Sequence, residues 1–462
     1  MAKPIMLLGC TSDAGKSLLA AAACRVLANR GVNVAPFKAQ NMSNNAAVTP
    51  DGLEIGRAQY LQALAAKVTP DVRMNPVLLK PSADTYSQVI VNGVANAEIS
   101  AMAWMERKSL LWQHVKNALT SLQSDYDQLV IEGAGSPAEI NLRAGDIVNM
   151  AVALETQADV YLISDIDRGG SFAHLLGTWA CLAPQEQGLI KGFVLNKFRG
   201  DPLLLGNAMD WLQEKTGIPT VANIPMYDHR LPEEDAFRGS DTFVKGELNI
   251  ALVIYPYAAN MDEFDPLFHQ QGVNVTVIRE QQSLSRFDAV ILPGSKNSGA
   301  SMAYLANTGL AQSVIDAAQL GKLVLGICGG LQILGEKLLD PRRLEAGDFD
   351  GLGLLPLTTE LAQIKSTSQV HFQWQNQPMT GYEIHHGQTQ TTGKVSEFLQ
   401  SNLGWQRENV VGIYLHGAFE NAVFMSWFVH QLGQDLPTQD WHQIIDIELD
   451  SLAEKFARDG WL

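Results

Sequence analysis

Short apolar runs alternate with amphipathic segments through the first half of the chain. Residues 16–30 and 54–67 place apolar side chains at helical spacing, which predicts two helices. The apolar runs between and after them are rich in Val, Ile and Leu and too short for helices, so they are predicted to be buried strands. They are residues 5–9, 32–37, 128–133, 159–164 and 192–197. Such strands, separated by helices, indicate a parallel α/β sheet.

A polar, charged stretch broken by Pro and Gly, residues 226–248, interrupts this pattern and is interpreted as a linker or surface loop. A second α/β pattern follows, with strands predicted at 248–257, 287–295, 322–328 and 410–417. Residues 345–395 are expected to be irregular or antiparallel β, and the last twenty residues have the pattern of a closing helix. We therefore predict two parallel-sheet α/β domains, residues 1–230 and 248–440, with a helical extension to 462.

Composition narrows the class of protein. A chain of 462 residues is too long for one ordinary core, which agrees with two domains. The net charge of −16 argues against nucleic acid as a main partner, because phosphate backbones need a basic surface. The chain contains no run of about 18 apolar residues, so no membrane span is predicted. The N-terminus has no signal-peptide pattern. Four scattered cysteines suggest neither a disulfide framework nor a zinc site, so a cytoplasmic location is expected.

The run GCTSDAGKS at residues 9–17 follows the first predicted strand and precedes a helix. In that arrangement backbone N–H groups and the helix N-terminus cradle phosphates. Gly15 permits the tight turn, Lys16 can bridge the outer phosphates and Ser17 can ligate Mg²⁺. Asp13 can reach the metal through water or simply cap the loop. Five residues rather than four separate the two glycines, so strict Walker ATPases fit poorly, and a surface turn that happens to contain Gly-Lys-Ser is the alternative.

Three further side chains follow predicted strands at the same sheet edge. Glu132 ends a buried strand, where a Mg²⁺ ligand belongs, although it could instead cap the next turn. Lys38 closes the second strand and could neutralise a transferring phosphoryl group and a substrate carboxylate, the alternative being a solvated lysine. Asn196 follows the fifth strand and could contact the adenine of a nucleotide, although its signal is weak. These residues extend the predicted nucleotide and Mg²⁺ site.

The stretch 326–330, Gly-Ile-Cys-Gly-Gly, lies between an apolar strand and a helical pattern, which is the form of a nucleophile elbow. The glycines allow a sharp turn, and the helix N-terminus favours the thiolate of Cys328. The N–H of Gly329 can stabilise an oxyanion. A buried structural cysteine is the alternative, and it is the interpretation favoured for the other three, Cys10, Cys24 and Cys181.

A thiol nucleophile also needs a second oxyanion donor and a base. The loop LPGSK at 292–296 can supply the donor through Gly294 or Ser295. His416 is the favoured base, because it ends a predicted parallel strand and would project over the same sheet edge as the elbow. His385 and His386 compete, but both lie in the irregular or antiparallel segment.

These motifs resemble known families. The phosphate loop is similar to that of dethiobiotin synthetase and related ATP-dependent carboxylate-activating enzymes. PGS, GICGGLQILG and YLHG, in that order over about 248–435, resemble class I glutamine amidotransferases, which implies a flavodoxin-like domain. That family uses a Cys-His-Glu triad with the Glu two residues beyond the His, where this chain has Ala418, and Glu420 is not expected to reach the same nitrogen. The resemblance therefore implies a dyad, with a backbone carbonyl or another side chain orienting His416, as in amidases of the cobyric and cobyrinic acid subgroup.

Across the whole chain the runs TSDAGKS, PFKAQNMSNN, EIGRAQ, MNPVLLKP, SQVIVNG and IEGAGSPAEINL are similar to the cobyric acid synthase family. The resemblance implies ATP- and glutamine-dependent amidation of the b, d, e and g carboxylates of adenosyl-cobyrinic a,c-diamide through acyl phosphates, with Mg²⁺. The polar runs 40–45 and 84–88 are candidates to line a corrinoid pocket.

Three alternatives remain at this point. One is the sister cobyrinic acid a,c-diamide synthase, another is a ParA-like nucleotide switch, and the third is a non-catalytic scaffold that has kept both folds. The sequence leaves the oligomeric state open.

Overall fold

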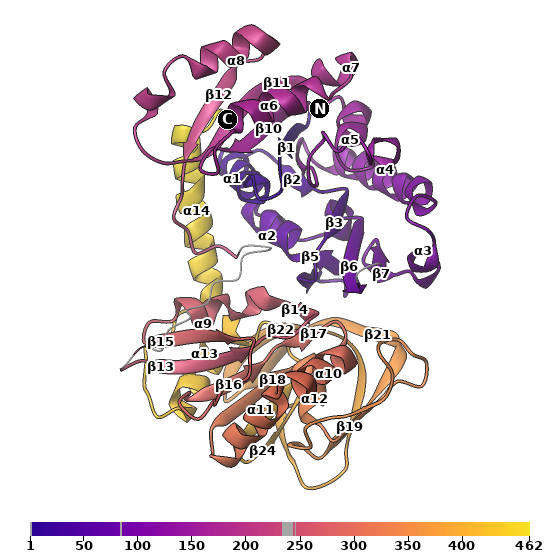
Figure 1. The fold of residues 1–462 in the computed structure, drawn as a ribbon, viewed down its shortest axis with the longest axis vertical. Coiled ribbons are helices and arrows are strands. Elements are labelled where there is room, and N and C mark those ends of the chain that lie inside the picture. The colour runs from indigo at the N-terminus through magenta and orange to yellow at the C-terminus, as the bar shows by residue number, and fades with distance from the viewer. Residues whose placement is uncertain (1, 84–85, 233–243, 245) are drawn as a thin grey trace.

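The computed structural model describes residues 2–83, 86–232, 244 and 246–462, in which the chain forms two α/β halves, each around its own main sheet (Figure 1). Part of the predicted linker, residues 233–243 and 245, lies outside the described residues. So do Asp84 and Thr85 of the second polar run. No helix within the described ranges is long and apolar enough to cross a membrane.

The first half contains a six-stranded sheet in which every pairing is parallel and the order is β12-β11-β10-β1-β9-β2. The strands are β1 (Ile5–Gly9), β2 (Val34–Phe37), β9 (Gln128–Glu132), β10 (Asp159–Asp165), β11 (Ile190–Phe198) and β12 (Thr220–Pro225). All five strands predicted for this half are confirmed. The edge strand β12 was not predicted, since its run TVANIP is short and mixes apolar with polar residues.

Helices pack around the sheets of the first half. They are α1 (Lys16–Asn29), α2 (Arg57–Ala65), α3 (Ala97–Ala101), α4 (Arg107–Asp125), α5 (Met150–Thr156), α6 (Ser171–Ala180), α7 (Pro184–Gln187) and α8 (Ala208–Thr216). The helix predicted at 54–67 begins later, because residues 54–56 pair as a strand and Gly56 caps α2 in an extended conformation.

Small strands line the side of this half that faces the second half. A four-stranded sheet has the order β3-β6-β7-β8, and a two-stranded sheet pairs β4 with β5. Their bounds are β3 (Gln40–Met42), β4 (Ala46–Val48), β5 (Glu54–Gly56), β6 (Val77–Ala83), β7 (Tyr86–Val91) and β8 (Val94–Ala95). Their position means that residues 40–56 can contact both halves.

The second half contains a seven-stranded sheet of order β15-β13-β16-β18-β25-β24-β23, parallel as far as β25 and antiparallel beyond it. The strands are β13 (Leu248–Val253), β15 (Val273–Ile278), β16 (Ala289–Leu292), β18 (Leu323–Ile327), β23 (Ser396–Leu399), β24 (Gly404–Arg407) and β25 (Val410–Ile413). The four predicted strands of this half are confirmed and form its centre, whereas β15, β23 and β24 were missed.

The helices of the second half include one that ends the chain. They are α9 (Asp265–His269), α10 (Ser298–Thr308), α11 (Leu310–Gln319), α12 (Gly329–Leu334), α13 (Ala422–Gln431) and α14 (Trp441–Asp459), with short 3-10 turns η4 (Met261–Phe264) and η5 (Ala418–Glu420). A small ladder pairs β14 (Ala258–Ala259) with β17 (Gly294–Ser295).

The segment expected to be irregular or antiparallel contains a long antiparallel hairpin. Strand β21 (Leu357–Trp374) pairs with β22 (Gln377–Thr391), next to β19 (Lys337–Leu339) and β20 (Phe349–Asp350). The hairpin reaches the first half, where Lys365 Nζ lies 2.7 Å from Glu54 Oε2.

The closing helix α14 is confirmed as a helix, but it packs against the first half of the chain. Figure 1 shows it, in yellow, running from the second half to the side of α1. Its apolar face joins the core beneath α1, and Arg25 Nη2 lies 2.5 Å from Asp446 Oδ1. At its start Trp441 stacks on His269 of the second half with ring centroids 5.6 Å apart. The helix therefore contacts both halves and joins them.

Candidate active sites

The phosphate loop has the predicted strand–loop–helix geometry. It leaves β1 at Gly9 and enters α1 at Lys16, and both Asp13 (φ 55°) and Gly15 (φ 91°) adopt left-handed conformations. A Cβ atom at Gly15 would lie 2.2 Å from Asn196 Nδ2, so only glycine fits there. The loop is thereby held in the shape that lines up backbone N–H groups for an anion.

Glu132 accepts hydrogen bonds from several polar side chains of this site. Its Oε1 accepts hydrogen bonds from Ser17 Oγ at 2.7 Å and Lys38 Nζ at 2.9 Å, and its Oε2 accepts one from Gln62 Nε2 at 2.7 Å. Burial raises the pKa of Glu132, but the charge and hydrogen bond of Lys38, the hydrogen bond from Gln62 and the charge of Lys16 outweigh it and lower the pKa. Lys38 is buried and ion-paired, so the solvated-lysine alternative is wrong. The sequence did not single out Gln62.

The other residues predicted to bind the nucleotide are hydrogen-bonded or ion-paired within and around the phosphate loop. Asn196 Nδ2 donates to Ala14 O at 2.8 Å, and Lys197 Nζ donates to Asp13 O at 2.7 Å. The Asp13 carboxylate lies 3.3 Å from Arg168 Nη2. Asn196 therefore supports the loop from beneath, and its contact with adenine stays a prediction.

A cavity of about 1120 Å³ opens around this site. Its size exceeds the roughly 300–1,000 Å³ of ordinary small-molecule pockets, so it has room for a nucleotide together with a second substrate. Within the first predicted polar run, Gln40, Asn41, Met42 and Asn45 line it. Of the second run, Gln88 instead accepts a hydrogen bond from Lys296 at the boundary between the halves.

The residues present fit a bound Mg²⁺ ion. Ser17 and Glu132 offer a hydroxyl and a carboxylate side by side, and oxygen ligands are those that Mg²⁺ prefers. Among the described residues no group of three or more His, Cys, Asp or Glu side chains could hold a metal alone. A cation here would thus share its coordination sphere with phosphate oxygens and water.

Cys328 has the predicted elbow geometry. It lies between β18 and α12 with φ 51° and ψ −103°, a conformation that side chains other than glycine rarely adopt. A Cβ atom at Gly330 would lie 2.1 Å from Leu292 O, so the elbow requires glycine there. The sulfur lies 4.0 Å from Ile384 O, and the residue is 6% exposed. The thiol is therefore held at a strained turn on the sheet edge.

Two loops meet where an oxyanion would form. A Cβ atom at Gly329 would lie 2.6 Å from the backbone nitrogen of Ser295. Lys296 N donates to Tyr257 O, and because an antiparallel ladder alternates, Ser295 occupies the non-hydrogen-bonded position between Lys296 and Gly294. The ladder thus favours the Ser295 amide over that of Gly294 as the second donor.

His416 follows β25, close enough to Cys328 for the charge of the thiolate to act on its ring. Its Nδ1 lies 3.0 Å from Glu263 Oε1, so Nε2 is the ring nitrogen that remains for proton exchange with the sulfur. Burial lowers the pKa of His416, but the charges of Glu263 and Cys328 more than offset it and raise that pKa to about 10. Of the two orienting groups that the sequence left open, a backbone carbonyl or another side chain, the structure has the side chain, Glu263, which gives a Cys-His-Glu arrangement.

The third member, Glu263, was missed by sequence reasoning. It lies in η4, 153 positions before His416, and its Oε2 accepts a hydrogen bond from Gly417 N at 3.3 Å. Its only sequence signal is a carboxylate a few residues past the first strand of the second half. Glu420 does not contact His416, as expected, and pairs with Arg57 instead.

The competing histidines have other partners. His385 Nδ1 lies 2.9 Å from Gly387 O, and its ring stacks on Tyr414. His386 Nδ1 lies 3.0 Å from Ala362 O, and burial together with nearby lysines lowers its pKa to about 4. Both rings thus have partners of their own, whereas the charge of Cys328 acts on His416, so His416 is the base that the geometry favours.

The remaining cysteines differ from one another. Cys10 and Cys24 are buried, as expected of structural residues, and burial raises the pKa of Cys10 to about 11. Cys181 is exposed at the end of α6, so the prediction that it is buried was wrong. Its run TWACLAP is apolar, but the turn after α6 lies at the surface.

Comparison with known proteins agrees with these two sites. Residues 5–238 match the model of the CobQ/CobB/MinD/ParA nucleotide binding domain, and residues 249–424 match the CobB/CobQ-like glutamine amidotransferase domain. A cobyric acid synthase from Deinococcus radiodurans is 50% identical over 97% of this chain and 97% of its own length. One from Variovorax paradoxus is 47% identical over 97% and 96%, and one from Paracidovorax citrulli is 48% identical over 100% and 97%. With a phosphate loop in one half and a cysteine elbow in the other, the chain belongs to the cobyric acid synthase family.

Proposed function

We propose that this protein converts carboxylates of a corrinoid into amides, using ATP and the amide nitrogen of glutamine. The acceptors are the b, d, e and g side chains of adenosyl-cobyrinic a,c-diamide, and the product is cobyric acid. The observation that carries the proposal is the pairing of a phosphate loop with a cysteine elbow in one chain whose relatives along nearly the whole length are cobyric acid synthases. The scattered cysteines lead us to expect this reaction in the cytoplasm.

Glutamine hydrolysis supplies the nitrogen. The Cys328 thiolate attacks the amide carbon, and the oxyanion accepts hydrogen bonds from backbone N–H groups near Gly329 and Ser295. The imidazolium of His416 donates its proton to the departing nitrogen, so the C–N bond breaks and ammonia and a thioester form. Neutral His416 then takes a proton from water, whose oxygen attacks the thioester carbon. The C–S bond breaks, glutamate leaves, and the Cys328 thiolate and the His416 imidazolium are restored. Glu263 keeps the imidazole oriented and balances its charge throughout.

Carboxylate activation takes place at the phosphate loop. Lys16 and Lys38 are placed to neutralise charge while a substrate carboxylate oxygen attacks the γ-phosphorus of ATP and ADP leaves. Ammonia then attacks the carbonyl carbon of the acyl phosphate, phosphate departs, and a proton is lost to give the amide. Ser17 and Glu132 would hold Mg²⁺, which when bound supplies charge neutralisation and phosphate orientation.

Mass spectrometry of cobyrinic a,c-diamide incubated with protein, Mg-ATP and glutamine tests this function. Stepwise changes from acid to amide that need ATP are expected, ending at four per molecule of adenosylated substrate. Amidation of cobyrinic acid at two sites instead would assign the sister activity, a,c-diamide synthase. An unchanged corrinoid alongside active glutamine hydrolysis would mean that the acceptor is wrong.

A further inference from the structure

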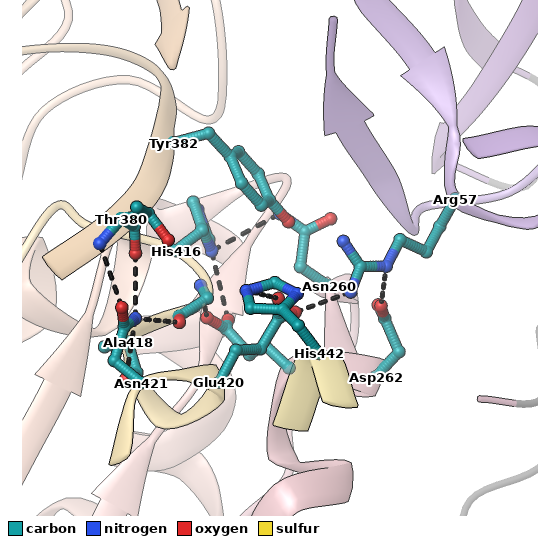
Figure 2. A network of polar contacts seen from close by, with 12 residues as sticks. Arg57, Asn260, Asp262, Thr380, Tyr382, His416, Ala418, Glu420, Asn421 and His442 are labelled. Carbon is teal, nitrogen blue, oxygen red and sulfur yellow. Dashed lines mark hydrogen bonds and ion pairs between the residues drawn. The ribbon is translucent and has the colours of Figure 1, made fainter. Parts of the chain in front are cut away.

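An arginine of the first half reaches into the second half beside the triad. Arg57, the first residue of α2, places Nε 2.7 Å from Asp262 Oδ2 and Nη2 2.5 Å from Glu420 Oε1. Figure 2 shows its side chain extending towards these two carboxylates, in the network that also contains His416. We call this arrangement of Arg57, Asp262 and Glu420 the arginine clamp.

The clamp holds the two segments that set the triad geometry. Asp262 directly precedes Glu263 in η4. Glu420 ends η5, which begins one residue after Gly417, whose N–H donates to Glu263. One guanidinium therefore bridges η4 and η5 close to the Glu263–His416 hydrogen bond. A shift of either segment would change the distance between that carboxylate and the imidazole.

The guanidinium of the clamp also compensates the charges of buried carboxylates. The Asp262 and Glu420 side chains are only 4% and 10% exposed, and they lie next to the third carboxylate, Glu263. Burial raises the pKa of Asp262 to about 6, while the Arg57 charge acts in the opposite direction. Without the guanidinium, Asp262 would lose its ion-pair partner, and Glu420 would keep only the exposed imidazole of His442, 3.8 Å away. Buried like charges so weakly compensated are costly, and the structure would relieve the cost by movement or protonation.

A second contact of the first half supports the same segment. Ala46 N donates to Asn260 Oδ1 at 3.0 Å, and Met261 N donates to Asn45 Oδ1 at 3.1 Å. Ala46 O in turn accepts a hydrogen bond from the hydroxyl of Tyr382, whose ring stacks on His416 with centroids 5.3 Å apart. The start of η4 is thus built partly on residues of the first half.

On the basis of the function proposed above, we propose that Arg57 is a positioning residue of the glutamine-hydrolysing centre. Its guanidinium holds η4 and η5 at the spacing at which Glu263 orients His416. The amidotransferase half therefore reaches full glutaminase activity only while it is docked on the ATP-binding half.

The test measures glutamate release from glutamine by full-length wild type, R57A and R57K. Because misplacing catalytic groups by about 1 Å can cost on the order of 100-fold, R57A is expected to lower glutaminase kcat by about 10- to 100-fold. The KM for glutamine should change by less than about threefold, since the clamp does not contact the sulfur. R57K keeps the charge but loses the forked geometry, so an intermediate kcat is expected, and it replaces R57A if that variant does not fold.

A double-mutant cycle with E263Q shows whether Arg57 acts through Glu263. If it does, R57A adds little to the loss already caused by E263Q, so the two effects are far from multiplicative. A general loosening of the protein would instead multiply the two losses. Amidation with ammonium as nitrogen source is measured in parallel, and the ratio of glutamine- to ammonium-dependent rates is expected to fall at least about tenfold in R57A.

R73A is the matched control. It also removes an arginine that is ion-paired with two carboxylates, but Arg73 and its partners Asp71 and Asp125 all belong to the first half. Its glutaminase kcat is expected to stay at the wild-type value.

Three results would overturn the proposal. They are a kcat within about twofold of wild type in R57A, multiplicative losses in the cycle, and an equal fall of the glutamine- and ammonium-dependent rates. Absence of glutamate release from the wild-type protein would instead contradict the proposed function, which keeps the two failures distinct.

Discussion

Each candidate site is built around a buried carboxylate, and the two carboxylates are held in different ways. Glu132 takes its partners from its own half: Ser17, Lys38 and Gln62. Glu263 takes the imidazole of His416 from its own half, but its segment is held in place by the other half. The contacts of Glu132 therefore lie within one half, whereas the segment that carries Glu263 is held across the boundary between the halves.

The surroundings of the two carboxylates differ to match. Glu132 lines a cavity of about 1120 Å³. Its pKa is lowered, which keeps the carboxylate ionised, as a Mg²⁺ ligand needs to be. Glu263 is buried, and its charge raises the pKa of His416. The comparison shows that the ATP site leaves its carboxylate open to substrates, whereas the thiol site buries its carboxylate to orient an imidazole. Variants that separate the two activities can test this difference.

Removing the nucleophile should have the largest effect. C328A is expected to lower glutamine-dependent amidation by at least about 10³-fold, because loss of a catalytic nucleophile removes the covalent route. Amidation with ammonium should persist, since the ATP site is untouched. Product formation from each nitrogen source is measured, with C181S, at an exposed cysteine, as the control. Loss of both activities would assign Cys328 a structural role.

Removing the phosphate-loop lysine should break the other site. K16A is expected to lower amidation by on the order of 10²–10³-fold with either nitrogen source, because a buried charge facing the phosphates is lost. Glutamate release should continue. The control is K215A in exposed α8. A normal amidation rate in K16A would contradict the nucleotide assignment.

Neutralising the third triad member should give a moderate loss and a shifted pH profile. E263Q is expected to lower glutaminase kcat about 10- to 100-fold. The Glu263 charge offsets the burial that lowers the pKa of His416, so that pKa, about 10 in the wild type, falls in the variant. The active imidazolium then loses its proton at lower pH, and the alkaline limb of kcat/KM moves to lower pH.

The control for this profile is E383Q, which removes a carboxylate from His385 rather than from His416. Its alkaline limb should coincide with that of the wild type. An unmoved limb in E263Q would show that Glu263 does not set the charge of His416.

The smallest effect is expected where α14 packs against α1. R25A should lower the free energy of unfolding by about 1–3 kcal/mol, because it removes a buried side chain and an ion pair but leaves hydrated carboxylates behind. Thermal unfolding followed by circular dichroism checks this. An unchanged midpoint would mean that α14 is held by its apolar face alone.

Secondary structure near the two motifs was predictable because its signals are local. The strands through residues 5–9 and 322–328 are short apolar runs, and each motif follows its strand directly. The edge strands were missed where polar residues interrupt the apolar pattern, as in β12. The start of α2 was misplaced because residues 54–56 have helical spacing and yet pair with β4.

By itself the sequence determined the two α/β patterns, the phosphate loop and the cysteine elbow, because a few consecutive residues set the backbone of each. Only the tertiary structure decided which carboxylate orients His416, which arginine holds it, and where the last helix packs. Arg57 and Glu420 are 363 positions apart, and Glu263 and His416 are 153 apart. No local pattern encodes such pairs, since their proximity follows from the packing of whole sheets and helices against one another.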